Sequence, residues 1–214
     1  MLRATPGLDR GRSNHALTPV RTLDPSELAP ALARADAFAD RHGIRLGIQV
    51  SPEHLHGPLE RLLDERGWDA RWPTVVMTGA PGVRTAEDGL VVEEHASPTW
   101  LAAWARCEGR PDVQAHADTV FALLRGRARF ARLDDDAVAI GVPGDGLLGL
   151  YCIAVAPERR RTGLGRAIVT ALCAHDRDAT PYLQVEARNT PAIALYRQLG
   201  FEEVYRYRHR VRRP

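Results

Sequence analysis

The sequence predicts an α/β protein with a mixed, twisted sheet that is flanked by helices. Segments with strand-like and helix-like patterns alternate along almost the whole chain, as they do in α/β folds. Residues 147–155 (LLGLYCIAV) are apolar throughout, which is typical of a strand covered on both faces. The composition, 44% hydrophobic and 26% charged, is ordinary for a globular protein.

The N-terminal part of the chain shows two helical patterns, each followed by a strand pattern. Asp24-Pro25-Ser26-Glu27 offers N-cap chemistry to the first helix, and Gly43 is suited to end it. The strands are marked by alternating or β-branched apolar residues. The predicted elements are helices over 26–42 and 53–66 and strands over 44–50 and 72–78.

A turn-rich stretch at 81–89 separates this part from the remainder. It contains Gly, Pro and acidic residues without a periodic pattern, so we interpret it as a linker. It divides the chain into an N-terminal half, 1–80, and a C-terminal domain, 90–214. The elements predicted in the latter are strands over 90–94, 128–133, 137–142, 147–155, 181–187 and 201–212, and helices over 98–108, 111–125, 163–176 and 191–199.

Both parts contain a similar strand–helix–strand unit. Gln49-Val50 in the first corresponds to Gln184-Val185 in the second, and the helices end at Gly67-Trp68 and Gly200-Phe201. Such self-similarity predicts a duplicated, tandem arrangement. The competing interpretation is that any two strand–helix–strand units look alike.

The most informative segment is 155–167 (VAPERRRTGLGRA). A buried strand ends at Val155, an arginine-rich loop follows, and a helix begins near Gly163. Glycines let backbone N–H groups approach a ligand closely, and a helix N-terminus favours an anion. The pattern indicates a pyrophosphate site, whereas Arg159–Arg161 alone would indicate only a solvated basic turn.

Two common phosphate motifs are excluded. The Walker pattern requires a lysine, and the chain has none. The dinucleotide fingerprint fails because Ile168 stands where its last glycine belongs. Arg160-x-x-Gly163-x-Gly165, preceded by Val155-Ala156-Pro157, instead resembles the acetyl-CoA motif of the GCN5-related N-acetyltransferase (GNAT) superfamily. A second GNAT block is matched downstream, at Leu183-Gln184-Val185, Asn189, Ala192, Leu195-Tyr196 and Gly200-Phe201.

The resemblance covers about residues 90–214 and implies a GNAT fold with one acetyl-CoA site there. It also implies that 1–80 is a degenerate GNAT-like half, because that half lacks R-x-x-G-x-G. The implied cofactor-binding residues are Ile153, Ala154, Val155, Arg160, Arg161, Thr162, Gly163, Leu164, Gly165, Asn189 and Tyr196.

Roles within this set follow from the resemblance. The backbones of Ile153 and Val155 would face the pantetheine arm and the acetyl carbonyl, and Asn189 would hydrogen-bond the arm. Tyr196 would be catalytic, donating a proton to the departing CoA thiolate, which suits a phenol of pKa near 10. Taken by themselves, Asn189 could cap the next helix and Tyr196 could simply pack under the sheet.

The general base is not identified by the sequence. Many GNAT enzymes carry a glutamate on the strand before V-x-P, but 147–155 contains no carboxylate. A water chain, or an acidic residue of 93–118 such as Glu93 or Asp118, is left as the candidate.

Other features exclude several classes of function. The eight histidines form no H-x-x-x-H or H-E-x-x-H pattern and the three cysteines no C-x-x-C pair, so we expect no metal. Arginines alternate along 201–212, which we interpret as an exposed charged strand face. The net charge of +2 gives no reason to expect nucleic acid as a partner.

No apolar run approaches the roughly 20 residues of a membrane span, and no signal-peptide pattern opens the chain. We therefore expect a cytoplasmic monomer or homodimer with no membrane partner. The expected activity is acetyl transfer from acetyl-CoA to a primary amine of a small molecule or of a peptide N-terminus. The alternatives are a non-catalytic CoA-binding regulatory or scaffold protein and, more distantly, a nucleic-acid-binding module that uses the C-terminal arginines.

Overall fold

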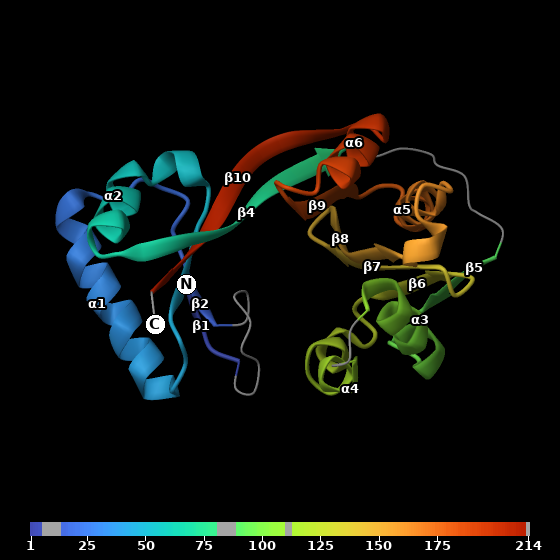
Figure 1. Cartoon of the computed structure of the whole chain (residues 1–214), viewed down its shortest axis with the longest axis horizontal. Helices are drawn as coiled ribbons and strands as arrows, with labels where there is room; N and C mark the ends of the chain where they lie inside the picture. The colour runs from blue at the N-terminus through green and yellow to red at the C-terminus, as the bar shows by residue number, and fades with distance from the viewer. Residues whose placement is uncertain (6–13, 81–88, 110–112, 213–214) are drawn as a thin grey trace. The chain divides into compact units, whose positions relative to one another are not determined.

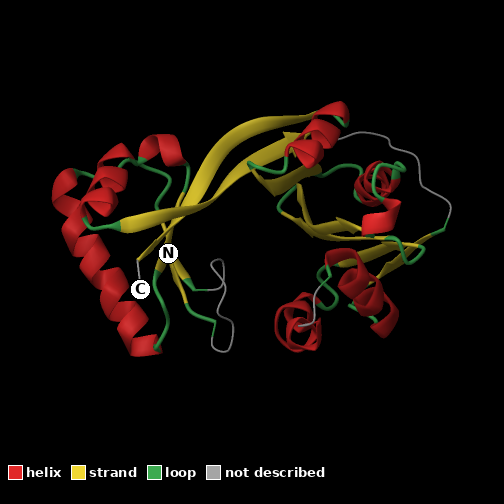
Figure 2. Cartoon of the chain, in the orientation of Figure 1, coloured by secondary structure: helices red, strands yellow, loops and turns green. Residues whose placement is uncertain are grey.

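The computed structural model describes residues 1–5, 14–80, 89–109 and 113–212. It divides the chain into two compact units (Figures 1 and 2). The first contains Met1–Val76, Val185–Asn189 and Val204–Pro214, and the second contains Met77–Gln184 and Thr190–Glu203. Most of the C-terminal strand, from Val204 onward, thus belongs to the first unit, so the units are not continuous in sequence as the halves 1–80 and 90–214 are. Most of the predicted linker, 81–88, lies outside the described residues.

The first unit contains β1, β2, β3, most of β4 and of β10, and the helices α1 and α2, with the strands in the order β1-β2-β3-β10-β4. The predicted helix 53–66 is interrupted at His56, because a short 3-10 turn precedes α2. The elements are β1 (Leu2–Arg3), β2 (His15–Leu17), α1 (Pro25–His42), β3 (Gly47–Val50), the 3-10 turn Glu53–Leu55, α2 (Gly57–Glu65), β4 (Trp68–Gly79) and β10 (Phe201–Arg212).

Helix α1 begins and ends where its sequence predicts. The Asp24 carboxylate accepts from the Ser26 N–H at 2.9 Å, and the Glu27 carboxylate accepts from the Asp24 N–H at 2.9 Å. This reciprocal capping box satisfies N–H groups that have no partner inside the helix. Gly43 ends the helix in a left-handed conformation at φ 58°, which glycine adopts without strain.

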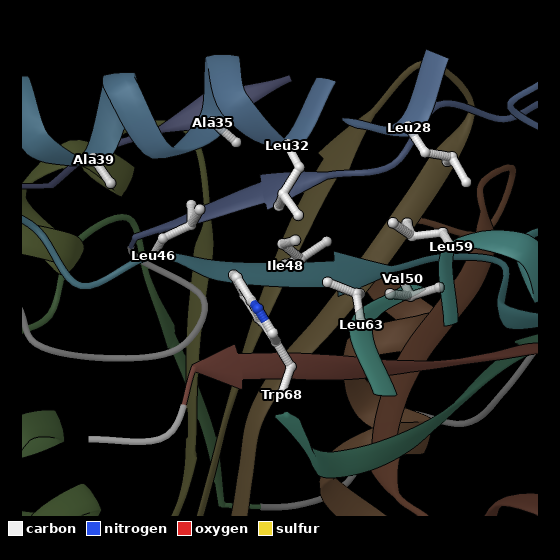
Figure 3. Packing of buried hydrophobic residues seen from close by; sticks show 10 residues of the cluster. All are labelled: Leu28, Leu32, Ala35, Ala39, Leu46, Ile48, Val50, Leu59, Leu63 and Trp68. Atoms are coloured by element: carbon white, nitrogen blue, oxygen red, sulfur yellow. The ribbon is translucent and has the colours of Figure 1, made fainter. Parts of the chain in front are cut away.

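The core of the first unit lies between α1, α2 and β3 (Figure 3). Leu28, Leu32, Ala35 and Ala39 recur every three or four residues, so they share one face of α1. Figure 3 shows this face turned toward β3, with α2 contributing further leucines. The buried members on the other elements are Leu46, Ile48, Val50, Leu59, Leu63 and Trp68.

The prediction that the arginines of β10 form an exposed charged face is wrong at Arg210, because its side chain is only 3% exposed. Its Nη1 donates to Glu60 at 2.9 Å, and its Nη2 donates to Asp64 and to the Trp68 carbonyl. The two carboxylates are one turn apart on α2 and point to one side of that helix. Burial of the guanidinium is possible because these acceptors compensate for lost hydration.

The second unit contains a sheet in the order β4-β9-β8-β7-β6-β5. Pairing is antiparallel from β5 to β8 and parallel between β8 and β9. The new elements are β5 (Leu90–Glu93), α3 (Pro98–Glu108), α4 (Val113–His116), β6 (Arg129–Leu133), β7 (Ala137–Gly144), β8 (Leu147–Val155), α5 (Leu164–His175), β9 (Thr180–Glu186) and α6 (Thr190–Gln198).

The helix predicted over 111–125 is broken. Four α-helical residues, Val113–His116, are followed by a π-helical turn, Ala117–Phe121, and a 3-10 turn, Ala122–Leu124. Phe121 belongs to the buried cluster of the second unit, with Val113, Val120 and Leu124 packed against it, and its ring lies edge to face with that of Trp104 at a centroid distance of 5.0 Å. Packing therefore overrides helical periodicity here.

Helices cover both faces of the β6–β8 sheet, with α3 on one side and α5 on the other (Figure 1). On the α5 side, Leu148 and Leu172 pack over Gly141, where a Cβ atom would lie 3.2 Å from each. On the α3 side, Trp100 is fully buried, and its ring lies 5.2 Å from that of Phe130. This two-sided coverage is the arrangement that the unbroken apolar run of β8 predicted, and the α/β class is confirmed.

Candidate active site

Strands β8 and β9 separate before either one ends. Among the described residues they pair only from Leu147 opposite Thr180 to Leu150 opposite Leu183, yet β8 continues to Val155. Over Tyr151–Val155 the strand changes from buried to partly exposed. The β9-facing backbone of this segment therefore lies outside the sheet ladder, and it can bind an extended ligand as an added strand would.

A β-bulge lies at this separation. The register of β8 against β7 shifts between Val138 opposite Ala154 and Ile140 opposite Tyr151. Ala139 is therefore faced by two residues, one of which, Cys152, has a left-handed φ of 50°. A bulge bends its strand and increases the local twist, which explains why β8 leaves β9 directly after Leu150.

The bulge also decides which backbone groups of β8 face the opening, the space between β8 and β9 beside Tyr151–Val155. The Ala156 N–H donates to the Asp136 carbonyl at 2.8 Å, on the β7 side. Because these directions alternate along a strand, the Ile153 and Val155 backbones face the opposite side, as expected for cofactor-binding residues. Ala154 lies opposite Val138, so its backbone faces β7 and not the opening.

The loop after β8 prepares the start of α5. Arg161 and Gly163 both adopt left-handed conformations, at φ 68° and 95°. The first helical bonds run from the N–H groups of Arg166 and Ala167 to the Gly163 carbonyl, at 2.9 and 3.0 Å. The N–H groups of Leu164 and Gly165 precede these bonds, and no side chain caps the helix. This end of α5 has the properties of an anion-binding site.

The two glycines of the motif have different tasks. A Cβ at Gly163 would meet nothing within 4 Å, so glycine is needed there for conformation and leaves open space beside the N–H groups. A Cβ at Gly165 would lie 3.2 Å from Leu195 Cδ2. Gly165 therefore allows α5 to pack closely against α6.

Ion pairs hold the loop against the sheet. Asp136 binds Arg106 at 3.0 Å and Arg159 at 3.4 Å, and Arg106 also binds Glu158. The Arg106 guanidinium lowers the pKa of the Glu158 carboxyl through a side-chain hydrogen bond. Exposed pairs contribute little stability singly, but a network of them restrains the loop. Arg159 therefore helps to hold the loop in place through its ion pair with Asp136.

The remaining loop residues are close to the strand end. Arg160 Nε donates to the Val155 carbonyl at 3.3 Å, and Thr162 Oγ1 donates to the Arg159 carbonyl at 2.6 Å. The loop from Arg160 to Gly163 is exposed. The structure thus brings the end of β8, the arginines and the N-terminus of α5 together, as the motif predicted.

Tyr196 is 6% exposed on α6, with its ring 6.0 Å from that of Phe201. Burial raises the pKa of its phenol to about 12. The side chain is therefore a packed aromatic and also a neutral hydrogen-bond donor at physiological pH. Asn189, the other predicted residue of this block, lies immediately before α6, and its N–H donates to the Glu186 carbonyl at 2.8 Å.

Glu93 is not suited to be a base at the opening. It lies on β5, which is three strands from β8, or about 14 Å at the usual strand spacing of ~4.8 Å. Its carboxylate accepts from Ser97 Oγ at 2.6 Å, and that hydroxyl caps α3. Asp118 is exposed and accepts from Gln114 Nε2 at 2.8 Å.

Sequence reasoning missed two features of the opening. One is the bulge at Cys152, which periodicity could not reveal because all its neighbours are apolar. The other is a contact between the hydroxyl oxygens of Tyr151 and Tyr182, 2.5 Å apart. The sequence places Tyr151 in the middle of one predicted strand, 147–155, and Tyr182 near the start of another, 181–187, but neither strand by itself shows the register that brings them together.

Neither a metal-binding cluster nor a membrane-spanning helix is found among the described residues. Within the described ranges, no group of three or more His, Cys, Asp or Glu side chains is placed to hold a metal ion. None of the helices that the structure describes is both long and apolar enough to cross a membrane.

Several known proteins similar to parts of this chain are named as acetyltransferases. Mycothiol acetyltransferase from Thermobispora bispora is 46% identical over 61 residues, which are 27% of this chain and 21% of that protein. [Ribosomal protein bS18]-alanine N-acetyltransferase from Escherichia coli is 47% identical over 57 residues, 25% of this chain and 38% of that protein. The matches thus span well under half of these relatives.

The fold is shared over a much longer range. A GCN5-related N-acetyltransferase from Kribbella flavida superposes with a TM-score of 0.71 at 19% identity, covering 97% of this chain and 84% of that one. A tandem GNAT protein from the clavulanic acid biosynthesis pathway superposes with a TM-score of 0.61 at 16% identity, covering 86% of this chain and 69% of that one. These similarities confirm the GNAT fold.

The family described as "Probable histone acetyltransferase Rv0428c C-terminal" matches residues 1–210. The match includes both compact units, the opened strands and the loop before α5. The chain therefore belongs to this family of the GCN5-related N-acetyltransferase superfamily.

Proposed function

We propose that the chain is an acetyl-CoA-dependent N-acetyltransferase that acts on a primary amine of a small molecule or of a peptide N-terminus. One observation carries the proposal: the opened edge of β8 leads directly into the uncapped N-terminus of α5. An extended arm that ends in a diphosphate matches this sequence of features. The family membership supports it.

The residues present fit acetyl-CoA. The Ile153 and Val155 backbones would pair with the pantetheine arm, and the N–H groups of Leu164 and Gly165 would bind the diphosphate together with Arg160. The absence of a Cβ at Gly163, where nothing lies within 4 Å, leaves room beside these donors. Arg161, Thr162 and Asn189 complete the proposed set. The bound cosubstrate would supply the activated thioester.

The chain itself would contribute hydrogen bonds to the reacting groups. A backbone N–H directed into the opening can stabilise negative charge that develops on a carbonyl oxygen. Tyr196, with a pKa of about 12, is a weaker acid than a thiol of pKa near 8.5 by about 3.5 units, or roughly 5 kcal/mol. Tyr196 would therefore donate a hydrogen bond to the leaving sulfur without fully transferring its proton.

The names of the relatives support both kinds of acceptor. One relative is named for mycothiol and another for an alanine of a ribosomal protein. Nucleic acid is disfavoured as a partner because Arg208, Arg210 and Arg212 bind Glu53, Glu60, Asp64 and Asp36.

The test is calorimetric titration with acetyl-CoA and with CoA. The wild-type protein should bind both at micromolar concentrations, and the double variant Arg160→Ala/Gly163→Asp should lose binding. Arg177→Ala is the matched control because Arg177 is exposed beyond the far end of α5. Binding would then justify a screen of primary amines. A wild-type protein that binds neither compound would refute the proposal.

A non-catalytic CoA-binding protein is the second candidate. It is favoured by one observation: β8 has no carboxylate, and Glu93 is held at α3. The variant Tyr196→Phe separates the two candidates. An enzyme should lose about 10²-fold in kcat, because one hydrogen-bond donor to developing negative charge is removed, whereas a binding protein would show no turnover in either form.

A further inference from the structure

Two tyrosines meet at the point where β8 and β9 separate. The hydroxyl oxygens of Tyr151 and Tyr182 are 2.5 Å apart, and the rings lie edge to face at 6.1 Å. Leu150 opposite Leu183 is the last pair in the ladder. Tyr151 is thus the first residue of the opened segment, and Tyr182 directly precedes the last paired residue of β9.

Gly149 makes this contact possible. It lies opposite Tyr182 in the ladder, and a Cβ there would be 2.6 Å from Tyr151 Cε2 and 2.8 Å from Tyr182 Oη. Real Cβ atoms do not approach so closely, so any larger residue would displace the two rings. The sequence of β8 is therefore adapted to place these hydroxyls together.

The pair lies on the α3 face of the sheet. Tyr151 packs against the buried cluster around Trp100, while Leu148 and α5 occupy the opposite face. Both tyrosines are partly exposed. The hydroxyls are thus beside the opening on the face opposite α5, whose N-terminus belongs to the proposed diphosphate site.

The chemistry of the pair suits an amine. Tyr151 is the one residue of β8 with oxygen or nitrogen in its side chain. When one hydroxyl donates to the other, both oxygens still have lone pairs that can accept from N–H groups. An ammonium group has only donors, and a neutral primary amine has two N–H donors beside its single lone pair, so two adjacent acceptor oxygens match either form without a buried carboxylate.

We propose that the Tyr151–Tyr182 hydroxyl pair anchors the amino group of the acceptor. The pair determines acceptor specificity, and it acts by positioning the amine beside the opened end of β8. This assignment rests on the proposed function in one respect, namely that the acceptor is a primary amine.

The test compares two small probes that differ only in an amino group, alaninamide and propionamide. Their affinities for the CoA-saturated protein are measured by NMR titration. The wild-type protein should prefer alaninamide, and Tyr151→Phe or Tyr182→Phe should each weaken alaninamide binding about tenfold while leaving propionamide unchanged. Tyr205→Phe, on β10, is the matched control.

A second variant perturbs the pair without removing a hydroxyl. Gly149→Ala should push the rings apart and reduce the preference for alaninamide in the same way, and CoA affinity measured by calorimetry should report that the fold is intact. The double variant Tyr151→Phe/Tyr182→Phe should lose little more than either single one, because the hydroxyls act as a unit.

The outcomes separate this proposal from the proposed function. No preference of the wild-type protein for alaninamide, an unchanged preference in the tyrosine variants, or an equal loss for propionamide would overturn the anchor. A protein that shows the predicted preferences but transfers no acetyl group would support the anchor and count against the proposed enzyme.

Discussion

Exchange of Gly163 for aspartate or for asparagine tests the diphosphate site most sharply. The two side chains have nearly the same shape and tolerate the left-handed region better than most residues. The Gly163 Cβ position faces open space, so neither should clash. Backbone strain at φ 95° costs both variants a similar amount, and their difference isolates one negative charge.

The magnitude follows from Coulomb's law. At about 5 Å in water-like surroundings, two unit charges interact by roughly 0.8 kcal/mol. This loop is exposed, so the water-like value applies, and a diphosphate presents two charges. Gly163→Asp should therefore bind CoA about 1.5 to 2 kcal/mol more weakly than Gly163→Asn, a factor of roughly 10 to 30.

The assay is calorimetric titration of both variants with CoA at low and high salt. Screening lengths of about 30 Å at 0.01 M and 3 Å at 1 M imply that the difference should largely disappear at high salt. Equal CoA affinities of the two variants at low salt would refute the placement of the diphosphate at Gly163. So would a difference that does not depend on salt.

Three further predictions concern buried groups. Burial raises the pKa of Tyr196 from 10.0 to about 12, so the phenol of the unfolded protein ionises at lower pH than that of the folded protein. Chemical denaturation should therefore show about 3 kcal/mol of stability that is present below pH 10 and lost by pH 12. Tyr196→Phe should abolish this dependence of stability on pH. Arg210→Ala should lower the free energy of unfolding by about 3 to 5 kcal/mol, since it leaves Glu60 without its buried partner, and urea denaturation would measure this. Burial raises the pKa of the Cys107 thiol to about 11, so iodoacetamide at pH 8 should alkylate it about 100-fold more slowly than a free thiol, as followed by mass spectrometry.

Most elements were predictable because their signals are local. The apolar run 147–155 and the alternation after Phe201 gave β8 and β10 with their observed bounds, and capping residues gave α1. Strands β1 and β2 were missed because two or three residues are too few for a periodic pattern. The pairing of such short segments depends on neighbours that are distant in sequence.

The local structure of the candidate site was predictable from sequence where it depends on backbone conformation, and it was missed where it depends on the register between strands. The glycine–arginine loop encodes its own conformation, so its sequence identified it. The contact between Tyr151 and Tyr182 requires that Gly149 lie opposite Tyr182, and no single strand contains that information. Arg210 is a similar case, because alternation along β10 does not show that α2 places two carboxylates beside it.

The two proposals assign donor and acceptor recognition to different kinds of group. The proposed donor site uses mainly N–H groups of an opened strand and a helix end, so it tolerates change wherever backbone conformation is kept. The proposed acceptor site uses side chains on the α3 face, where one substitution alters the chemistry presented. Such a division is compatible with solved structures that share the fold of this chain at 16–19% identity, and with relatives that are named for mycothiol and for an alanine of a ribosomal protein. The acceptor is therefore to be sought from residues such as Tyr151 and Tyr182, and not from the motif that identifies the family.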